Sequence, residues 1–358
     1  MPVANPIRVL IVDDSALVRK LLTEILGQAP GIEVVGAAQD PYIARDKIKA
    51  LDPDVLTLDV EMPRMDGLTF LRNLMRLRPM PVVMVSSLTA KGAEVTLHAL
   101  ELGAVDFVRK PDMDLRYGLQ EYADELVAKI RAAAGARVRA LPPLPARAAA
   151  AEGPAEIPRR AIQSFRTTDR VIAIGASTGG TEAIKEVLLR LPPDTPGVVI
   201  AQHIPPGFSA AFAERMNRQT GLVVKEAAEG DRVMSGHAYV APGDFHLEIA
   251  RDGARYVCRL NQNEPVNRHR PSVDVLFRSV VKAAGTNATA ALLTGMGADG
   301  AEGLKELHEI GVYTVAQNEA TSVVWGMPGE AVKRGAAREV LPLQQIADAL
   351  LKGAAAKR

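Results

Sequence analysis

Short apolar runs alternate with amphipathic helical patterns along this chain, in two series that a stretch of different composition separates. Strands and helices that alternate in sequence form a parallel sheet with helices on both faces. The strands expected in the first series are RVLIVDD, EVVGAAQ, DVLTLDV, PVVMVSS and VDFVRKP. This series therefore predicts an α/β domain of five β-α units, a (βα)5 fold, over residues 1–134.

The stretch between the two series is rich in alanine, proline and arginine. It has no sustained apolar period, and its prolines favour an extended chain. We interpret residues 135–168 as a linker. Its arginines are more simply explained as solvated side chains than as contacts to an acidic partner.

Alternation resumes in residues 169–358, where RVIAIG, GVVIAQ, ALLTGM and VYTVAQ read as buried strands. Helical patterns separate these runs. The segment HAYVAPGDFHLEIARDGARYVCRL has short alternating runs and an Asp-Gly pair, which is typical of a β-hairpin. We expect a doubly wound, mainly parallel α/β domain with a β-hairpin insertion.

The composition excludes several classes of protein. A formal net charge of +1 and the lack of a helix-turn-helix pattern disfavour a nucleic-acid partner. The single cysteine, Cys258, excludes an internal disulfide framework and is interpreted as a small strand residue. No secretory signal and no apolar run of about 18 residues is present, so we expect a cytoplasmic protein without membrane insertion.

Polar residues follow four of the five strands in the first series. Asp13 and Asp14 end the first strand, Asp59 the third, Ser86 the fourth and Lys110 the fifth. The carboxyl ends of parallel strands meet at one edge of a sheet, where ligands bind. We therefore expect these five side chains to share one pocket.

Three carboxylates in one pocket repel one another unless a cation lies between them, and oxygen ligands suit Mg²⁺. A lysine and a hydroxyl group beside a carboxylate suit a phosphoryl group. Asp59 is thus a candidate acceptor of phosphate as an acyl phosphate. The alternative is that Asp13 or Asp14 only caps the helix that begins near Ser15.

The turn GASTGG follows the first strand of the second series and has two possible functions. A dinucleotide-binding loop needs G-x-G-x-x-G, but Ser177 occupies the place of the second glycine, between Gly175 and Gly180. G-A-S-T-G also matches G-x-S-x-G, a sharp turn that exposes a nucleophilic serine. A third possibility is a serine that caps the following helix.

A serine nucleophile needs a base and an acid that orients the base. His203 directly follows the next buried strand, so it is the best candidate base among the six histidines. Asp299 follows the strand ATAALLTG and could orient His203, although it could equally cap its own helix. Backbone N–H groups near Met296 could stabilise an oxyanion.

The motifs IVDDS, LDVEMPRMDG, MVSS and FVRKP resemble the receiver domain of two-component response regulators, over residues 7 to 130. This resemblance implies that Asp59 is the phosphorylation site. It also implies that Asp13, Asp14, Asp59 and the backbone carbonyl of Glu61 bind Mg²⁺.

The same resemblance implies that Ser86 binds the phosphoryl group and that Lys110 forms its ion pair. Phe107 matches the position of the switch aromatic residue. Tyrosine also occurs at this position in the family. Because this chain has phenylalanine there, it lacks the hydroxyl group for such a contact.

The second domain resembles the catalytic domain of chemotaxis protein-glutamate methylesterases. The matching stretches are IGASTGGTEAI, AQHIPPGFSAAFAERMN, APGDFHLEI, RHRPSVDVLF, TGMGADGAEGL and AQNEATSVVWGMPGEAV. The resemblance implies Ser177 as nucleophile, His203 as base and Asp299 as orienting acid. It implies that Thr178 and Met296 help to form the cleft and the oxyanion site.

The two resemblances together imply an enzyme of chemotaxis adaptation. It would hydrolyse glutamate methyl esters, and deamidate glutamines, on the cytoplasmic region of chemoreceptors. A chemotaxis histidine kinase would phosphorylate the receiver in a reaction that requires Mg²⁺. Phosphorylation would uncover Ser177. Ester hydrolysis would need no cofactor. Two alternatives from other classes stay open: a nucleotide-binding oxidoreductase module, and an interaction protein with an inactive site.

Overall fold

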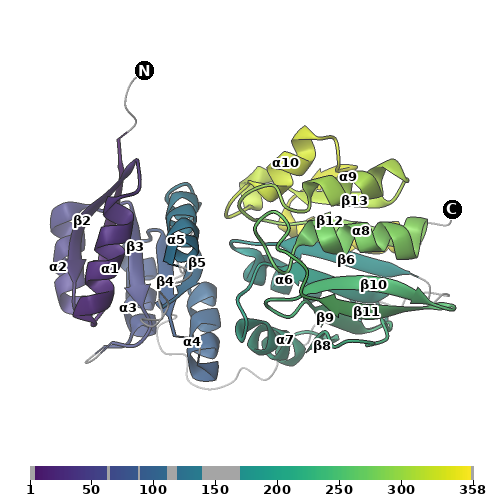
Figure 1. Ribbon diagram of the computed structural model, residues 1–358, viewed down its shortest axis with the longest axis horizontal. Helices are drawn as coiled ribbons and strands as arrows, with labels where there is room; N and C mark the ends of the chain where they lie inside the picture. The colour runs from purple at the N-terminus through teal and green to yellow at the C-terminus, as the bar shows by residue number, and fades with distance from the viewer. Residues whose placement is uncertain (1–4, 63–64, 88, 111–118, 139–169, 356–358) are drawn as a thin grey trace, which may run out of the picture. The chain divides into compact units, whose positions relative to one another are not determined.

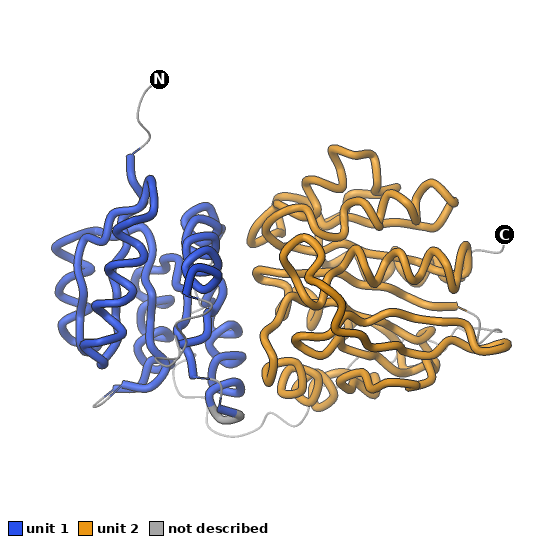
Figure 2. Tube along the Cα trace, in the orientation of Figure 1, with its two compact units in different colours: residues 1–142 blue, residues 143–358 orange. Residues whose placement is uncertain are grey.

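The computed structural model describes residues 5–62, 65–87, 89–110, 119–138 and 170–355. The chain forms two compact units, residues 1–142 and 143–358 (Figure 2). The linker predicted over residues 135–168 lies almost entirely outside the described residues. No helix among the described residues is long and apolar enough to cross a membrane.

The first unit is a (βα)5 fold with a five-stranded parallel sheet in the order β2-β1-β3-β4-β5 (Figure 1). Its strands are β1 (Ile7–Val12), β2 (Ile32–Ala38), β3 (Val55–Asp59), β4 (Val82–Ser86) and β5 (Asp106–Arg109). Its helices are α1 (Ala16–Gly27), α2 (Pro41–Leu51), α3 (Gly67–Leu77), α4 (Ala90–Glu101) and α5 (Leu119–Ala134). The predicted fold is confirmed.

The strand order fixes which helices share a face of this sheet. Crossovers between parallel strands are right-handed, so the reversal of direction after β2 places α1 opposite α2, α3 and α4. Helix α5 packs beside α1, and α4 packs beside α3. Both faces of the sheet are therefore covered, which explains why β3 and β4 are buried along their whole length.

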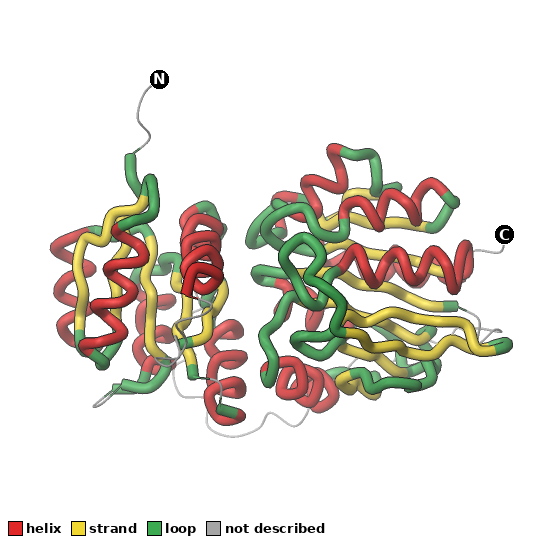
Figure 3. Tube along the Cα trace, in the orientation of Figure 1, coloured by secondary structure: helices red, strands yellow, loops and turns green. Residues whose placement is uncertain are grey.

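The second unit contains a seven-stranded parallel sheet in the order β14-β13-β12-β6-β7-β9-β8. Figure 3 draws the strands in yellow and the helices in red. Its strands are β6 (Val171–Ala176), β7 (Gly197–Gln202), β8 (Val223–Glu226), β9 (His237–Val240), β12 (Ala288–Leu292), β13 (Tyr313–Gln317) and β14 (Glu339–Leu341). Its helices are α6 (Gly180–Leu188), α7 (Phe208–Gln219), α8 (Val273–Ala284), α9 (Ala301–Glu309), α10 (Met327–Lys333) and α11 (Leu343–Ala355). Two 3₁₀ turns, η1 (Gly285–Asn287) and η2 (Glu319–Thr321), complete it.

The chain leaves the centre of this sheet in two directions. From β6 it continues through β7 toward β8 and β9, and from β12 it continues in the opposite direction toward β13 and β14. Strands β6 and β12 are neighbours, so the topological switch point lies between them. Ligands of doubly wound sheets bind at the carboxyl ends of the strands at such a point.

The β-hairpin insertion is smaller than the sequence predicts. Only β10 (His246–Asp252) and β11 (Arg255–Asn261) form it, as a separate antiparallel pair. The run HAYV, which we expected to belong to the hairpin, is strand β9 of the main sheet and pairs in parallel with β7 and β8. Its buried Ala238, Tyr239 and Val240 explain the difference, because this run is covered on both faces as a central strand is.

The hairpin and α8 bury one face of the main sheet. Buried side chains of the hairpin (Leu247, Tyr256) share one hydrophobic core with Phe277 of α8 and with strands β6, β7 and β12. The first residue of α8, Val273, approaches β6 so closely that a methyl group on Gly175 would lie 2.2 Å from Val273 Cγ1. A glycine at this position therefore lets the N-terminus of α8 reach the sheet.

We predict that Gly175→Ala lowers the free energy of unfolding of the second unit by about 1–3 kcal/mol, because an added methyl group overpacks the contact with Val273. Trp325, the only tryptophan in the sequence, lies in this unit, and its fluorescence during urea unfolding measures the change. Gly221→Ala is the control, since a methyl group there meets its nearest neighbour at 3.8 Å. Equal unfolding midpoints for the two variants would contradict the close packing at Gly175.

Candidate active site and acidic pocket

Ser177, His203 and Asp299 meet at the carboxyl edge of the second sheet. Ser177 follows β6 and His203 follows β7, and the Ser177 Oγ lies 3.0 Å from His203 Nδ1. The other ring nitrogen, Nε2, lies 2.8 Å from Asp299 Oδ2. Because a carboxylate only accepts, Nε2 carries the proton and Nδ1 is left to accept from the serine hydroxyl. The three residues form a continuous hydrogen-bonded chain.

The turn after β6 presents the serine and does not use it as a cap. Helix α6 is capped by Gly179, whose φ of +73° favours glycine, without a side-chain hydrogen bond. The serine N–H donates to the Thr294 carbonyl. The expectation that Ser177 only caps the following helix is therefore wrong.

Gln202 supports this geometry, although no motif in the sequence points to it. Its side-chain amide donates to the carbonyl oxygens of Ser177 at 2.9 Å and of His203 at 3.0 Å. The side chain occupies the space beside Gly180, where a methyl group would lie 2.1 Å from the Gln202 Oε1. The third glycine of the turn thus makes room for an amide that ties the backbones of Ser177 and His203 together.

One interpretation of the sequence expected Asp299 to cap its own helix. This is wrong, because Gly300 is the N-cap of α9. The Asp299 carboxylate lies instead at the N-terminus of α8. It accepts hydrogen bonds from Ser272 Oγ at 2.8 Å, from the N–H of Val273 at 2.7 Å and from the N–H of Asp274 at 3.2 Å. A helix N-terminus stabilises an anion, so the carboxylate is held ionised.

The Asn267 amide adds a further hydrogen bond to Asp299, at 2.7 Å, and donates at 2.8 Å to Asp274 as well. Burial alone would raise the pKa of Asp299, which is 2 % exposed. The hydrogen bonds from His203, Asn267 and Val273 outweigh burial and hold that pKa well below its ordinary value. Asp299 is therefore ionised at neutral pH.

The loop after β12 offers a candidate oxyanion donor. Gly295 anchors it: its N–H donates to the Val324 carbonyl, and its carbonyl accepts from the N–H groups of Gly326 and Met327. The N–H of the next residue, Met296, donates to no group among the described residues. The second candidate, Thr178, is buried, and its carbonyl accepts from Thr294 Oγ1. Thr178 belongs to the turn that carries Ser177, and Gly295, which precedes Met296, lies against it, because a methyl group there would lie 2.7 Å from Ser177 Cβ.

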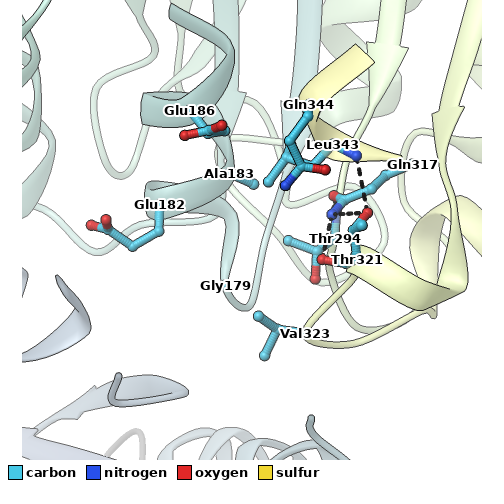
Figure 4. A pocket seen from close by; sticks show the side chains of 10 residues that line it. All are labelled: Gly179, Glu182, Ala183, Glu186, Thr294, Gln317, Thr321, Val323, Leu343 and Gln344. Carbon is cyan, nitrogen blue, oxygen red and sulfur yellow. Dashed lines mark hydrogen bonds between the residues drawn. The ribbon is translucent and has the colours of Figure 1, made fainter. Parts of the chain in front are cut away.

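A hollow of about 290 Å³ borders the same turn (Figure 4). Glu182 and Glu186 of α6 line one side, and Gln317, Thr321 and Gln344 line the other. Ser177, His203 and Asp299 do not line this hollow. Gly179 and Thr294 connect it to the site described above.

Asp13, Asp14 and Asp59 converge at the carboxyl edge of the first sheet, with ligand oxygens within 4.8 Å of one another. Lys110 Nζ lies 2.7 Å from Asp59 Oδ2 and 3.6 Å from Asp13 Oδ2. The helix that begins at Ala16 is capped by Ser15, so a capping role for Asp13 or Asp14 is wrong. Burial, helped by the charge of the neighbouring Asp13, raises the pKa of Asp59 to about 6 against the opposing hydrogen bond and charge of Lys110.

This cluster has the donor chemistry that Mg²⁺ prefers. All its ligand atoms are carboxylate oxygens, and the buried Oδ2 of Asp13 makes no hydrogen bond within the described part of the chain. The Glu61 N–H donates to Asp59 Oδ1 at 3.2 Å, so the backbone at Glu61 passes beside the carboxylates. The residues present therefore fit a divalent cation.

Ser86 ends β4 next to Lys110, whose N–H donates to the Ser86 carbonyl, and the Ser86 hydroxyl is engaged by another side chain. Thr96 Oγ1 of α4 donates to Ser86 Oγ at 2.7 Å, and both side chains are fully buried. No motif in the sequence points to Thr96. Phe107 is 4 % exposed, and its carbonyl accepts from Lys129 Nζ. Its ring therefore packs inside the unit.

Cys258 and two of the other histidines have structural contacts. Cys258 is fully buried, and burial raises the pKa of its thiol to about 12, so it is no nucleophile. His246 lies beside the Glu264 carbonyl and His308 beside Thr314. His269 is different, because its ring stacks on the ring of His203.

Two family models match the chain. The model described as CheB methylesterase matches residues 172–350, and the model of the response regulator receiver domain matches residues 9–116. The chain is 59% identical to "Protein-glutamate methylesterase/protein-glutamine glutaminase 1" of Xanthomonas campestris over 353 residues, 98% of each protein. It is 62% identical to the protein of the same name from Hahella chejuensis over 340 residues, which cover 95% of this chain and 94% of that protein.

Among solved structures, the chain is similar to the CheB methylesterase catalytic domain of Thermotoga maritima. The sequence identity is 34% and the TM-score 0.51, over 52% of this chain and 99% of that domain. The α/β fold expected for the second unit is confirmed.

We predict that Asp59→Asn stabilises the first unit by about 1–3 kcal/mol at pH 7.5 without divalent cations. The wild-type carboxyl has a folded-state pKa of about 6 against an ordinary 3.8, so its ionisation costs free energy only in the folded state. The contribution of Asp59 to wild-type stability therefore rises as the pH falls through 6, and the difference between the two proteins disappears below about pH 4.

Scanning calorimetry of the full chain measures this difference, with Trp325 fluorescence identifying the transition of the second unit. Asp46→Asn, which neutralises an exposed carboxylate, is the matched control and should leave the transition unchanged. A difference between Asp59→Asn and wild type that did not vary with pH would refute the raised pKa.

Proposed function

The chain belongs to the CheB methylesterase family, and on this premise we propose that Ser177, His203 and Asp299 form the catalytic triad of its esterase and glutaminase activity. The substrates are methyl esters of glutamate side chains, and selected glutamines, on the cytoplasmic region of chemoreceptors. The single observation that carries this proposal is the pair of short contacts on His203, 3.0 Å to the serine hydroxyl and 2.8 Å to the carboxylate.

In the first step Ser177 Oγ attacks the ester carbonyl carbon. His203 Nδ1 takes the hydroxyl proton, and Asp299 stabilises the imidazolium that results. The negative charge that develops on the carbonyl oxygen is stabilised by backbone N–H groups, for which Met296 and Thr178 are the candidates. The tetrahedral intermediate then collapses, the C–O bond to the methoxy group breaks, and His203 returns its proton to the departing methanol.

In the second step water hydrolyses the acyl-enzyme. His203 accepts a proton from the water as its oxygen attacks the acyl carbon, and the proton then returns to Ser177 Oγ as the bond to the serine breaks. The product is a glutamate carboxylate. Glutamine follows the same course, with ammonia in place of methanol, so one site serves both activities. The chemistry uses only protein groups and water.

The receiver unit regulates this activity through Asp59. A carboxylate oxygen of Asp59 forms a bond to phosphorus while the P–N bond to the phosphohistidine of a chemotaxis kinase breaks. Asp13, Asp14, Asp59 and the Glu61 carbonyl would hold Mg²⁺, which offsets the charge of the incoming group. Lys110 pairs with the phosphoryl group, and the Ser86 hydroxyl turns from Thr96 toward it.

Phosphorylation then shifts the population of the enzyme toward a state in which Ser177 is accessible to the receptor. The support for this gate is the presence of both family domains in one chain and the assembled acidic pocket.

We predict that methanol release from methylated chemoreceptor membranes ceases in Ser177→Ala and falls about 10³–10⁴-fold in Asp299→Asn, because the amide cannot stabilise the imidazolium. Release of labelled methyl groups measures the rate. Asp252→Asn, an exposed change at the tip of the hairpin, is the control and should keep the wild-type rate. Release that survives in Ser177→Ala would assign the nucleophile to another residue.

We further predict that a small phosphodonor with Mg²⁺ raises the wild-type rate about 10-fold or more and leaves Asp59→Asn at its basal rate. The same methanol assay, run with and without acetyl phosphate, measures the response. A full response in Asp59→Asn would exclude Asp59 as the regulatory site. The same basal rate in both proteins shows that the substitution leaves the esterase site intact.

A further inference from the structure

The ring of His269 lies parallel to the ring of His203. Their centroids are 3.6 Å apart and their planes differ by 18°. Both nitrogens of His203 are occupied in the ring plane, by Ser177 on one side and Asp299 on the other. The faces of the His203 ring are therefore its remaining contact surfaces, and His269 covers one of them.

The loop that carries His269 is held at several points. The backbones of Val266 and His269 exchange hydrogen bonds in both directions. The Arg270 guanidinium donates from Nε and a terminal nitrogen to Asp244 Oδ1, at 2.9 and 2.6 Å, and to the carbonyls of Gln262 and Asn263. These contacts fix the loop on both sides of the imidazole.

The same loop also orients the acid. Asn267, two residues before His269, donates to Asp299, and Ser272 donates to the same carboxylate three residues after it. The base and its acid are thus positioned by a single segment that follows the hairpin. A displacement of this segment would move the His203 ring and the Asp299 carboxylate together.

We propose that His269 is a positioning residue of the esterase, whose flat π face holds the His203 ring in the plane that aims Nδ1 at Ser177 Oγ. This inference rests on the proposed function. Two in-plane hydrogen bonds limit rotation of the imidazole, and a stacked ring adds a restraint perpendicular to that plane. It also excludes water from the covered face.

Stacking has a second effect that depends on the reaction. When His203 takes the serine proton, a positive charge lies above the π face of His269. A cation over an aromatic face is attracted to it, so the stacked ring favours the charged transition state over the uncharged ground state of His203. The loss of the face should therefore reduce the rate of the chemical step rather than binding.

The test compares His269→Phe, which keeps a flat π face, with His269→Leu, which fills the space without one. Full-length proteins react with a fluorophosphonate probe, in which Ser177 Oγ forms a bond to phosphorus, fluoride leaves and His203 takes the proton. We expect the maximal labelling rate of His269→Leu to fall about 10-fold at an unchanged half-saturating probe concentration. His269→Phe should restore the rate to within about 2-fold of wild type.

Arg268→Gln is the control, since Arg268 is exposed in the same loop, and Trp325 fluorescence reports folding of every variant. Equal rates for the leucine variant and wild type would overturn the proposal, and so would a phenylalanine variant as slow as the leucine one. If the leucine variant does not fold, the phenylalanine variant decides alone: a near-wild-type rate supports the proposal and a 10-fold loss overturns it. Wild-type protein that is not labelled at Ser177 would instead refute the proposed nucleophile.

Discussion

A buried, ionised carboxylate organises the catalytic unit. Asp299 is 2 % exposed, and burying an unpaired charge costs several kcal/mol. Its cost is offset by His203 and Asn267, and by the start of α8, where Ser272, Val273 and Asp274 all donate to its oxygens. For α8 to begin there, its first residue must contact β6 at a glycine, and the loop before it must cross the catalytic edge. The positions of Asn267 and His269 follow from that requirement.

The acidic pocket of the receiver unit has the opposite electrostatic character. Asp59 is as deeply buried as Asp299, but besides the Glu61 N–H it has one close cationic partner, Lys110, and an acidic neighbour, Asp13. Burial therefore raises its pKa, whereas hydrogen bonds lower that of Asp299. A fully compensated carboxylate suits a permanent orienting role. An incompletely compensated one suits a site that gains stability when a cation binds.

The strand-end residues of both units could be predicted because the alternation of strands and helices fixes which edge they share. Ser177 and His203 follow adjacent strands, and this order alone brings them to one place. The alternatives that failed were local. Capping by Asp13, Asp14, Ser177 or Asp299 is a good inference from a few neighbouring residues. The structure gives these capping roles to Ser15, Gly179 and Gly300, because strand ends and close packing leave the side chains other partners.

The sequence by itself determined the two α/β folds and the residues at the carboxyl ends of their strands, because hydrophobic periodicity and chain order are local properties. Only the tertiary structure decided which groups support those residues. Gln202, Asn267, Thr96 and His269 act across gaps of up to 66 residues, as the stack of His269 on His203 shows. Such contacts depend on how the hairpin and helices pack onto the sheet, and no periodic pattern records that packing. The stacked histidine pair is therefore a property of the folded chain alone.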